Sequence, residues 1–273
     1  MAVMCRMLAV YAGTQSVSAR YWLLGAPDDL EDQGRMNPDG AGIGWFDEDG
    51  TLRIDRAPIE ALDDPAFARD AREVGSRAVI AHVRHSSGTP RRFHNTMPFG
   101  RDGRLFAHNG ALGDLPAVEA LAGPWSQGLA GDTDSERYLA LICRRVAEAG
   151  SLSAGLAAAA TELSRSVPIL SLNCVMATPD ELVALRYPET DTLWLLVRPA
   201  GTGLSGSGSD GPIRVDGDRV AAPHVVVASE PLDREPGWRL LEPGELIHVD
   251  SRLHITSDRP LTGPPAQTLS IQT

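Results

Sequence analysis

The pattern of apolar and polar positions along the chain predicts strands that arrive as turn-linked pairs. The segments GIGWF (42–46) and TLRID (51–55) flank the turn sequence DEDG, while NCVMA (173–177) and LVALRY (182–187) flank TPDE. Short apolar runs on the two sides of such a turn are typical of antiparallel hairpins. The segment RAVIAHVRH (77–85) is rich in β-branched residues, so it predicts a further buried strand that leads into a loop.

Between the two strand pairs, the apolar residues recur at helical spacing. Residues 133–150 begin with Thr133 and Glu136 at the spacing of a capping box and end at Gly150. The apolar stripe of this helix consists of Leu139, Ile142, Cys143 and Val146. A second helix is predicted over 151–167. Strands, then helices, then strands again favour a layered α+β fold.

Composition excludes several classes of function. The 273 residues carry a net charge of −11 and no clustered basic stripe, so we expect no nucleic acid and no anionic membrane surface as partner. No long uncharged apolar run predicts a membrane span. The start MAVM lacks the features of a secretory signal, which predicts a cytoplasmic location.

The residues that most often bind metals or cofactors do not form a recognisable site. Three widely separated cysteines make neither a disulfide framework nor a zinc motif. His82 and His85 are three apart in a predicted strand and should point to opposite faces, so they cannot chelate one ion. The glycines of GTGLSGSGSDG (201–211) match GxGxxG, but SGSDGP opposes the helix that a dinucleotide-binding turn requires. We therefore expect no metal and no cofactor.

Cys5 has two interpretations, because it stands directly behind a second methionine, Met4. It could be an ordinary buried residue of an apolar first strand. If translation starts at Met4 and that methionine is removed, Cys5 becomes the terminal residue. Its α-amino group, with a pKa of ~7.7–8.0, could then help to deprotonate its own thiol, whose ordinary pKa is ~8.5.

Four further segments bear on this choice: NPDGAGIGWF (37–46), AHVRHSSGTP (81–90), LFAHNG (105–110) and GDTDSE (131–136). Together with Cys5 they resemble the class II glutamine amidotransferase domain, a branch of the N-terminal nucleophile hydrolases. LNCVMA, ALRY and VVVASEPLDREPGW are similar to the stand-alone members of that family. The resemblance implies a four-layer αββα sandwich. We expect one domain over 1–273, with 1–4 absent or removed, a flexible surface loop at 201–216 and a loose tail at 262–273.

The resemblance also implies the catalytic residues. Cys5 would attack the γ-glutamyl amide and form a thioester, its own amine relaying the proton. Asn109 and Gly110 would donate a side-chain and a backbone N–H to the oxyanion. From local sequence alone, Asn-Gly could simply make a tight turn. His108, beside Asn109, is expected to pack or hydrogen-bond behind it, and Asp39 is expected to support the nucleophile.

Substrate binding is assigned in the same way. Arg84 could hold the α-carboxylate in a two-pronged pair, or it could form an ion pair with a nearby acid. Asp134 could accept the α-ammonium, although the helix dipole alone would also favour an acid there. The resemblance places Ser87 near the carboxylate, where members fused to synthase domains usually have threonine.

Three functions remain open. The first is a glutaminase that releases ammonia, for use by a separate synthase. The second is a hydrolase of another γ-glutamyl amide, as in ergothioneine biosynthesis. The third is a non-catalytic binding or regulatory subunit in which MAVM blocks Cys5. The segment HVRHSSG favours the first over the second, because it looks less like the arginine segment of the ergothioneine enzymes.

Overall fold

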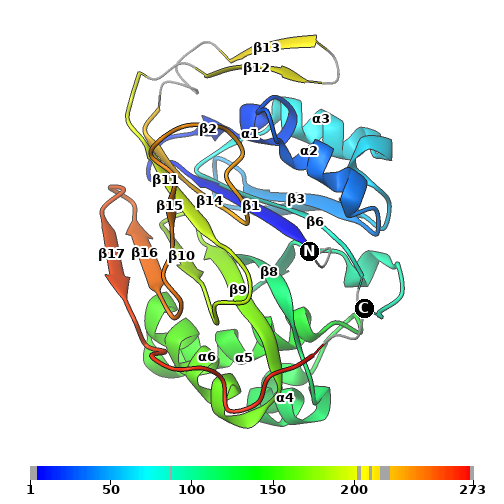
Figure 1. Cartoon of the computed structure of the whole chain (residues 1–273), viewed down its shortest axis with the longest axis vertical. Helices are drawn as coiled ribbons and strands as arrows, with labels where there is room; N and C mark the ends of the chain where they lie inside the picture. Colours follow the sequence, from blue (N-terminus) through cyan, green and yellow to red (C-terminus); the bar gives the residue numbers. More distant parts are fainter. Residues whose placement is uncertain (1–4, 87, 202–203, 209–210, 216–221, 271–273) are drawn as a thin grey trace.

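Two antiparallel sheets form the centre of the molecule (Figure 1). The structure is a computed structural model that describes residues 5–86, 88–201, 204–208, 211–215 and 222–270. The seven-stranded sheet has the order β15-β11-β14-β1-β6-β3-β4. Its strands are β1 (Arg6–Tyr11), β3 (Ala41–Phe46), β4 (Leu52–Ala57), β6 (Ala78–Val83), β11 (Trp194–Arg198), β14 (His224–Ala228) and β15 (Arg239–Leu240).

The second sheet has six strands in the order β17-β16-β10-β9-β8-β7. These strands are β7 (Phe99–Arg101), β8 (Arg104–Leu112), β9 (Ile169–Ala177), β10 (Glu181–Leu185), β16 (Leu246–Asp250) and β17 (Ile255–Asp258). The predicted hairpins are confirmed, because β3 pairs with β4 and β9 pairs with β10, both antiparallel. The predicted buried strand is β6, which lies between β1 and β3.

Helices cover the outer face of each sheet. The helices α1 (Arg20–Leu24), α2 (Leu30–Gln33) and α3 (Pro65–Glu73) pack on the seven-stranded sheet. The helices α4 (Leu115–Ala122), α5 (Asp134–Ala149) and α6 (Leu152–Ser166) pack on the six-stranded sheet. A third apolar cluster fills the space between the sheets. These clusters define the four layers of an αββα sandwich, as the resemblance implied (Figure 1).

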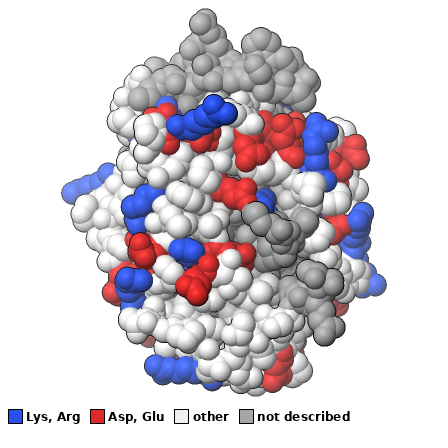
Figure 2. Space-filling view, viewed as in Figure 1, with Lys and Arg blue, Asp and Glu red and all other residues white. Residues whose placement is uncertain are grey.

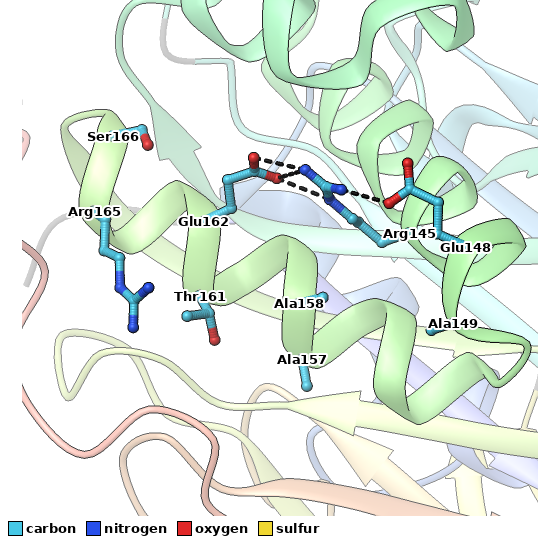
Figure 3. A pocket seen from close by; sticks show the side chains of 9 residues that line it. All are labelled: Arg145, Glu148, Ala149, Ala157, Ala158, Thr161, Glu162, Arg165 and Ser166. Carbon is cyan, nitrogen blue, oxygen red and sulfur yellow. Dashed lines mark hydrogen bonds and ion pairs between the residues drawn. The ribbon is translucent and has the colours of Figure 1, made fainter.

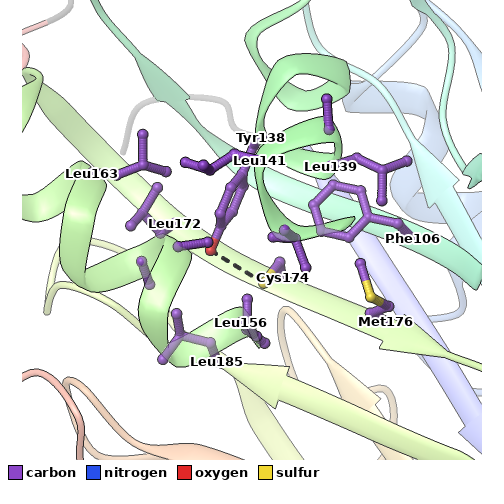
Figure 4. Close-up of a cluster of buried hydrophobic side chains, with 14 of the residues drawn as sticks. Phe106, Tyr138, Leu139, Leu141, Leu156, Leu163, Leu172, Cys174, Met176 and Leu185 are labelled. Carbon is purple, nitrogen blue, oxygen red and sulfur yellow. Dashed lines mark hydrogen bonds between the residues drawn. The ribbon is translucent and has the colours of Figure 1, made fainter. Parts of the chain in front are cut away.

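The helices α5 and α6 follow the local signals in the sequence. Thr133 caps α5 by accepting from the backbone N–H of Glu136, and Gly150 ends it in the left-handed conformation. Ser151 caps α6. Cys143 is fully buried in the cluster beneath these helices, as predicted; Figure 4 shows this cluster around Tyr138, whose hydroxyl lies 3.7 Å from the sulfur of Cys174.

The remaining elements are short. Two-residue strands β2 (Val17–Ser18) and β5 (Gly75–Ser76) pair with each other. The 3-10 turns are η1 (Gly34–Met36), η2 (Ala61–Asp63), η3 (Phe93–Asn95) and η4 (Gly123–Ser126). None of the helices in the described part of the chain is long and apolar enough to span a membrane. Acidic and basic side chains are interspersed over the face in Figure 2, consistent with the lack of a basic stripe.

Two segments that the sequence predicts to be loosely held contain some regular contacts. The predicted loop at 201–216 contains a hairpin, β12 (Leu204–Gly208) paired with β13 (Gly211–Val215). Its glycine-rich sequence has no alternating apolar pattern, so only backbone pairing reveals the strands. The predicted loose tail is held in part, because Ala266 donates to Ser164 and Leu269 donates to Ile169 through backbone hydrogen bonds. Residues 1–4 and 271–273 lie outside the described residues.

Candidate active site

Cys5 stands immediately before β1, at the edge of the space between the two sheets. Strand alternation places it on the same face as Met7, which belongs to the apolar cluster between the sheets. Its sulfur lies 3.3 Å from both the backbone nitrogen and the carbonyl oxygen of His85. Burial raises the pKa of this thiol to about 11, although the His85 amide and the positive charge of Arg84 favour the thiolate; Asp134 opposes it. The thiol therefore needs a base.

Arg84 directly follows β6 and is buried, and one of its two terminal nitrogens makes hydrogen bonds. Its Nη2 donates to the hydroxyls of Ser86 (3.1 Å) and Thr89 (2.6 Å) and to the Thr89 carbonyl oxygen (3.2 Å). Its Nη1 is buried and has no hydrogen-bond partner among the described residues. Burial lowers the pKa of the guanidinium, and the nearby charges of Cys5 and two acids act against this shift. Arg84 forms no ion pair with an acid in the described part of the chain, so the ion-pair interpretation is wrong.

Asp39 braces the segment that carries Arg84. One of its carboxylate oxygens accepts from the backbone N–H of Ser86 at 2.6 Å, and the other forms an ion pair with Arg91. The main chains are also joined, because Asp39 donates to the Arg84 carbonyl and Arg84 donates to the carbonyl of Gly40. Asp39 therefore lies next to the segment that contacts Cys5 and fixes its path.

Asn109 lies inside a strand and not in a turn, so the tight-turn interpretation is wrong. β8 continues through it to Leu112, with an irregularity between Ala111 and Leu112. Alternation places Asn109 on the same face as Leu105 and Ala107, which belong to the cluster between the sheets. The side chain is buried, and its Nδ2 lies 3.5 Å from the hydroxyl of Ser229. Cys5 and Asn109 thus face the same space from opposite sheets.

Gly110 is required where it stands. An added Cβ would lie 2.0 Å from the carbonyl oxygen of Ser171 and 2.8 Å from Nε2 of His108. Because no real Cβ approaches backbone so closely, a larger residue would force β8 and β9 apart.

Asp134 is the first residue of α5, and its carboxylate is held by the end of β8. Oδ2 accepts from the backbone N–H of Leu112 at 2.8 Å. The hydroxyl of Ser135 lies 3.4 Å from Oδ1. The carboxylate can therefore accept further hydrogen bonds. Its negative charge also acts to raise the pKa of both Cys5 and Arg84.

His108 is buried next to Asn109 in β8. Its Nε2 lies 3.0 Å from the carbonyl oxygen of Ser171, and its Nδ1 lies 3.0 Å from the hydroxyl of Ser135. A carbonyl can only accept, so Nε2 carries the proton and Nδ1 accepts from Ser135. Burial lowers the pKa of His108 and so disfavours the charged ring.

The two histidines of the arginine segment have different surroundings. His82 is fully buried within β6, where burial lowers its pKa to about 3, whereas His85 lies beyond the strand against the thiol of Cys5. Among the described residues, no three His, Cys, Asp or Glu side chains are grouped so that they could hold a metal ion.

In the structure, Cys5, Arg84 and Asp134 are close enough for the charge of each to affect the pKa of the Cys5 thiol or the Arg84 guanidinium. Asn109 faces Cys5 from the opposite sheet. Ser87 lies outside the described residues. Sequence reasoning missed the residues that hold the site together, namely Ser86, Thr89, Arg91 and Ser229. The first three lie within seven residues of Arg84, so their nearness in sequence could have identified them. Ser229 is far away in sequence and gave none.

A surface groove lies elsewhere on the molecule. It runs between the outer helices α5 and α6, where Arg145 forms ion pairs with Glu148 and Glu162 (Figure 3). The groove contains none of the candidate catalytic residues, so we do not assign the chemistry to it.

A cysteine at the head of the first strand, between two antiparallel sheets enclosed by helices, is the arrangement that the fold and the candidate site define. Residues 4–265 match the family model described as "Glutamine amidotransferases class-II". The chain belongs to the class II glutamine amidotransferase family and is an enzyme.

Curated relatives and solved structures agree with this membership. The chain is 32% identical over 227 residues to "Gamma-glutamyl-hercynylcysteine sulfoxide hydrolase" of Mycolicibacterium smegmatis, which covers 82% of this chain and 83% of the relative. The protein of that name from Mycobacterium tuberculosis is 28% identical over 260 residues, covering 91% and 94%.

Two solved structures show the same fold at low identity. A glutamine aminotransferase class-II domain protein from Silicibacter pomeroyi has a TM-score of 0.64 and 18% identity, and covers 94% of this chain and all of its own. The glutamine phosphoribosylpyrophosphate amidotransferase of B. subtilis has a TM-score of 0.62 and 20% identity, and covers 95% of this chain and 50% of its own.

Proposed function

We propose that this enzyme is an N-terminal cysteine amidohydrolase that cleaves γ-glutamyl amides through a thioester. The observation that carries the proposal is the buried Arg84, whose charge acts on the Cys5 thiol and whose Nη1 has no hydrogen-bond partner among the described residues. A buried cation with a free hydrogen-bond donor calls for an anionic partner, and the α-carboxylate of a glutamyl group supplies one.

The base is the free amine of Cys5, which exists once residues 1–4 are absent. Translation from Met4 followed by loss of that methionine produces this terminus, and so does cleavage of a short leader. The amine takes the thiol proton, and the thiolate attacks the amide carbon. When the C–N bond breaks, the proton passes to the leaving amine. Water then attacks the thioester, gives a proton back to the amine, and releases glutamate and the thiol.

The other residues bind and stabilise. Asn109 and Gly110 donate to the oxyanion that forms in both steps. Arg84 and Asp134 bind the α-carboxylate and α-ammonium, with Ser87 contributing on the carboxylate side. Two residues act indirectly: Asp39 fixes the Arg84 segment, and His108 fixes Ser135 beside the carboxylate of α5.

The leading substrate is a γ-glutamyl conjugate whose leaving group is larger than ammonia. The curated relatives support this choice, because the proteins that match 82–91% of this chain are named as hydrolases of γ-glutamyl-hercynylcysteine sulfoxide. Glutamine is the second candidate, supported by the description of the family model and by the segment HVRHSSG. In that case the ammonia would serve a separate synthase.

Substrate competition separates the candidates. Protein that begins at Cys5 is offered glutamine, γ-glutamylmethylamide and γ-glutamylcysteine with a substituted sulfur, at equal concentration, and glutamate release is measured. Preference for the substituted cysteine supports the conjugate hydrolase, and preference for glutamine supports the ammonia donor. If none of the three releases glutamate, and mass spectrometry shows that the native protein retains MAVM, the result supports the non-catalytic subunit.

A further inference from the structure

Ser229 occupies an irregular position at the end of β14, where that strand would continue its pairing with β1. The backbone N–H of Ser229 donates to the carbonyl oxygen of Met7 at 3.0 Å, as in a regular antiparallel ladder. The return bond differs, because the carbonyl oxygen of Ser229 accepts from the hydroxyl of Thr192 at 2.7 Å. The backbone N–H of Met7 donates to the Ser229 side-chain oxygen instead, at 3.0 Å.

This arrangement leaves the Ser229 hydroxyl with one hydrogen to donate. A hydroxyl has one donor hydrogen and two acceptor lone pairs, and Met7 uses one of the lone pairs. The neighbouring polar group is the buried carboxamide of Asn109, 3.5 Å away. Both residues are nearly inaccessible, with 3% and 2% of their surfaces exposed, so water does not compete freely for these groups.

The carboxamide can face Ser229 with either end. With Nδ2 toward Ser229, the hydrogen bond is long at 3.5 Å, and Oδ1 is buried with no partner in the part of the chain that the structure describes. With Oδ1 toward Ser229, the hydroxyl hydrogen satisfies that oxygen, and both hydrogens on Nδ2 are free. The two ends of an amide have nearly the same shape, so hydrogen bonding decides between the orientations. The second orientation gives Oδ1 a donor and leaves the buried Nδ2 without an acceptor until a substrate oxyanion supplies one, so the proposed role of Asn109 selects this orientation.

We propose that Ser229 is the positioning residue of the oxyanion donor: its hydroxyl donates to Oδ1 of Asn109 and so leaves the amide N–H groups free for the reacting substrate. This inference rests on the proposed function of Asn109. The same hydroxyl accepts from Met7, two residues beyond Cys5, so it aligns the strand of the nucleophile in one sheet with the oxyanion donor in the other.

Kinetics of a double-mutant cycle tests the role. In protein that begins at Cys5, Ser229→Ala should lower kcat about 10- to 100-fold with KM within about twofold, less than the about 100- to 1,000-fold expected for Asn109→Ala. In the Asn109→Ala background, Ser229→Ala should cause no further loss. Ser229→Thr, which retains a hydroxyl, should recover most of the rate. An equal loss in both backgrounds, or a loss confined to KM, would overturn the proposal.

Ser76→Ala is the matched control. Ser76 is also buried, and its hydroxyl also accepts from a strand N–H, that of Phe46, at 3.2 Å. It lies in β5, away from the candidate site, so kcat should be unchanged at a temperature where the variant is folded.

A structural measurement keeps the two proposals apart. Neutron diffraction from deuterated crystals of Cys5→Ala locates the Ser229 deuteron without any need for activity. Deuterium between Ser229 and an Asn109 oxygen supports the inference, and an ND₂ group facing Ser229 overturns it. If wild type and Cys5→Ala hydrolyse γ-glutamyl amides equally, the proposed function fails while the neutron result still decides the orientation.

Discussion

Cys5 and His85 are joined by two hydrogen bonds across 80 residues of sequence: the thiol donates to the His85 carbonyl, and the His85 N–H donates to the sulfur, both at 3.3 Å. The pairing of β1 with β6, which sets Arg6 opposite Val83, brings the segment after β6 over the head of β1. The nucleophile and the arginine that would bind substrate are therefore fixed by the same pair of strands.

Replacement of Cys5 by alanine should abolish hydrolysis and leave the fold intact. The residue is partly exposed as a whole and alanine lacks only the sulfur atom, so the substitution removes little packing. Glutamate release and the thermal unfolding midpoint check the two parts of this prediction. Cys143→Ala is the control, because that thiol is buried in the core; it should lower stability by about 1–3 kcal/mol and keep activity in the folded protein. Turnover by Cys5→Ala would exclude the mechanism.

The pH dependence of the thiol should differ between blocked and processed protein. Burial raises the pKa of Cys5 to about 11, so alkylation by iodoacetamide in protein that retains residues 1–4 should accelerate about tenfold per pH unit between pH 7 and pH 9. That protein should show no hydrolysis at any pH. With the amine free, kcat/KM should rise to a plateau near pH 8, because the neutral amine is the base. Equal activity of both forms contradicts this prediction.

Arg84→Lys and Asn109→Ala should affect different kinetic constants. A lysine offers one point charge where the guanidinium offers a planar pair of donors, so Arg84→Lys should chiefly raise KM. Asn109→Ala removes a donor to the oxyanion and should chiefly lower kcat, by about 100- to 1,000-fold. Steady-state kinetics with the preferred γ-glutamyl amide measures both. If both substitutions altered kcat alone, the division of roles would be wrong.

Analogues of the substrate should test the two charged groups. Removing the α-carboxylate leaves the buried Arg84 without its partner, which costs about 3–5 kcal/mol for a buried charge. Removing the α-amino group leaves Asp134 without its partner, at a smaller cost because Asp134 is only half-buried. Competition assays should therefore show strong rejection of the first analogue and weaker rejection of the second. Equal cleavage of an amide that lacks the α-amino group would overturn the role of Asp134.

Gly110→Ala should destabilise the protein and reduce activity together. The added methyl would lie 2.0 Å from the carbonyl oxygen of Ser171, so β8 and β9 must separate at the oxyanion site. Overpacking of this kind costs about 1–3 kcal/mol, which chemical denaturation can measure. Gly263→Ala is the control, because nothing lies within 4 Å of the added methyl. Full activity in Gly110→Ala would show that the strands can adapt.

Asp29→Asn should stabilise the protein in a pH-dependent way. Asp29 is the buried N-cap of α2, and burial raises the pKa of its carboxyl to about 7 from an ordinary 3.8. Between pH 4 and pH 7 the Asp29 carboxyl is ionised in the unfolded chain but still protonated in the folded protein. The free energy of unfolding of the wild type therefore falls as pH rises through this range. Asparagine caps as well as aspartate and carries no charge. The variant should therefore match wild type near pH 4 and exceed it at pH 8, by about 1–3 kcal/mol in chemical denaturation. An equal difference at both pH values contradicts this.

The sequence by itself determined the elements whose signals are local. The helix α5 could be predicted because Thr133 and Gly150 mark its ends, and the hairpin of β3 and β4 because a turn separates two apolar runs. The motifs around Cys5 and Arg84 also indicated the family, because they lie in short continuous segments.

Only the tertiary structure decided what depends on strands that are distant in sequence. Asn109 lies in a strand and not in a turn because β9 pairs with β8 along its length. Ser229 contacts Met7 and Asn109 across 222 and 120 residues, and no local pattern predicts such contacts. Helical periodicity and turn chemistry arise between neighbours in the chain, whereas the packing of two sheets selects which buried polar groups meet.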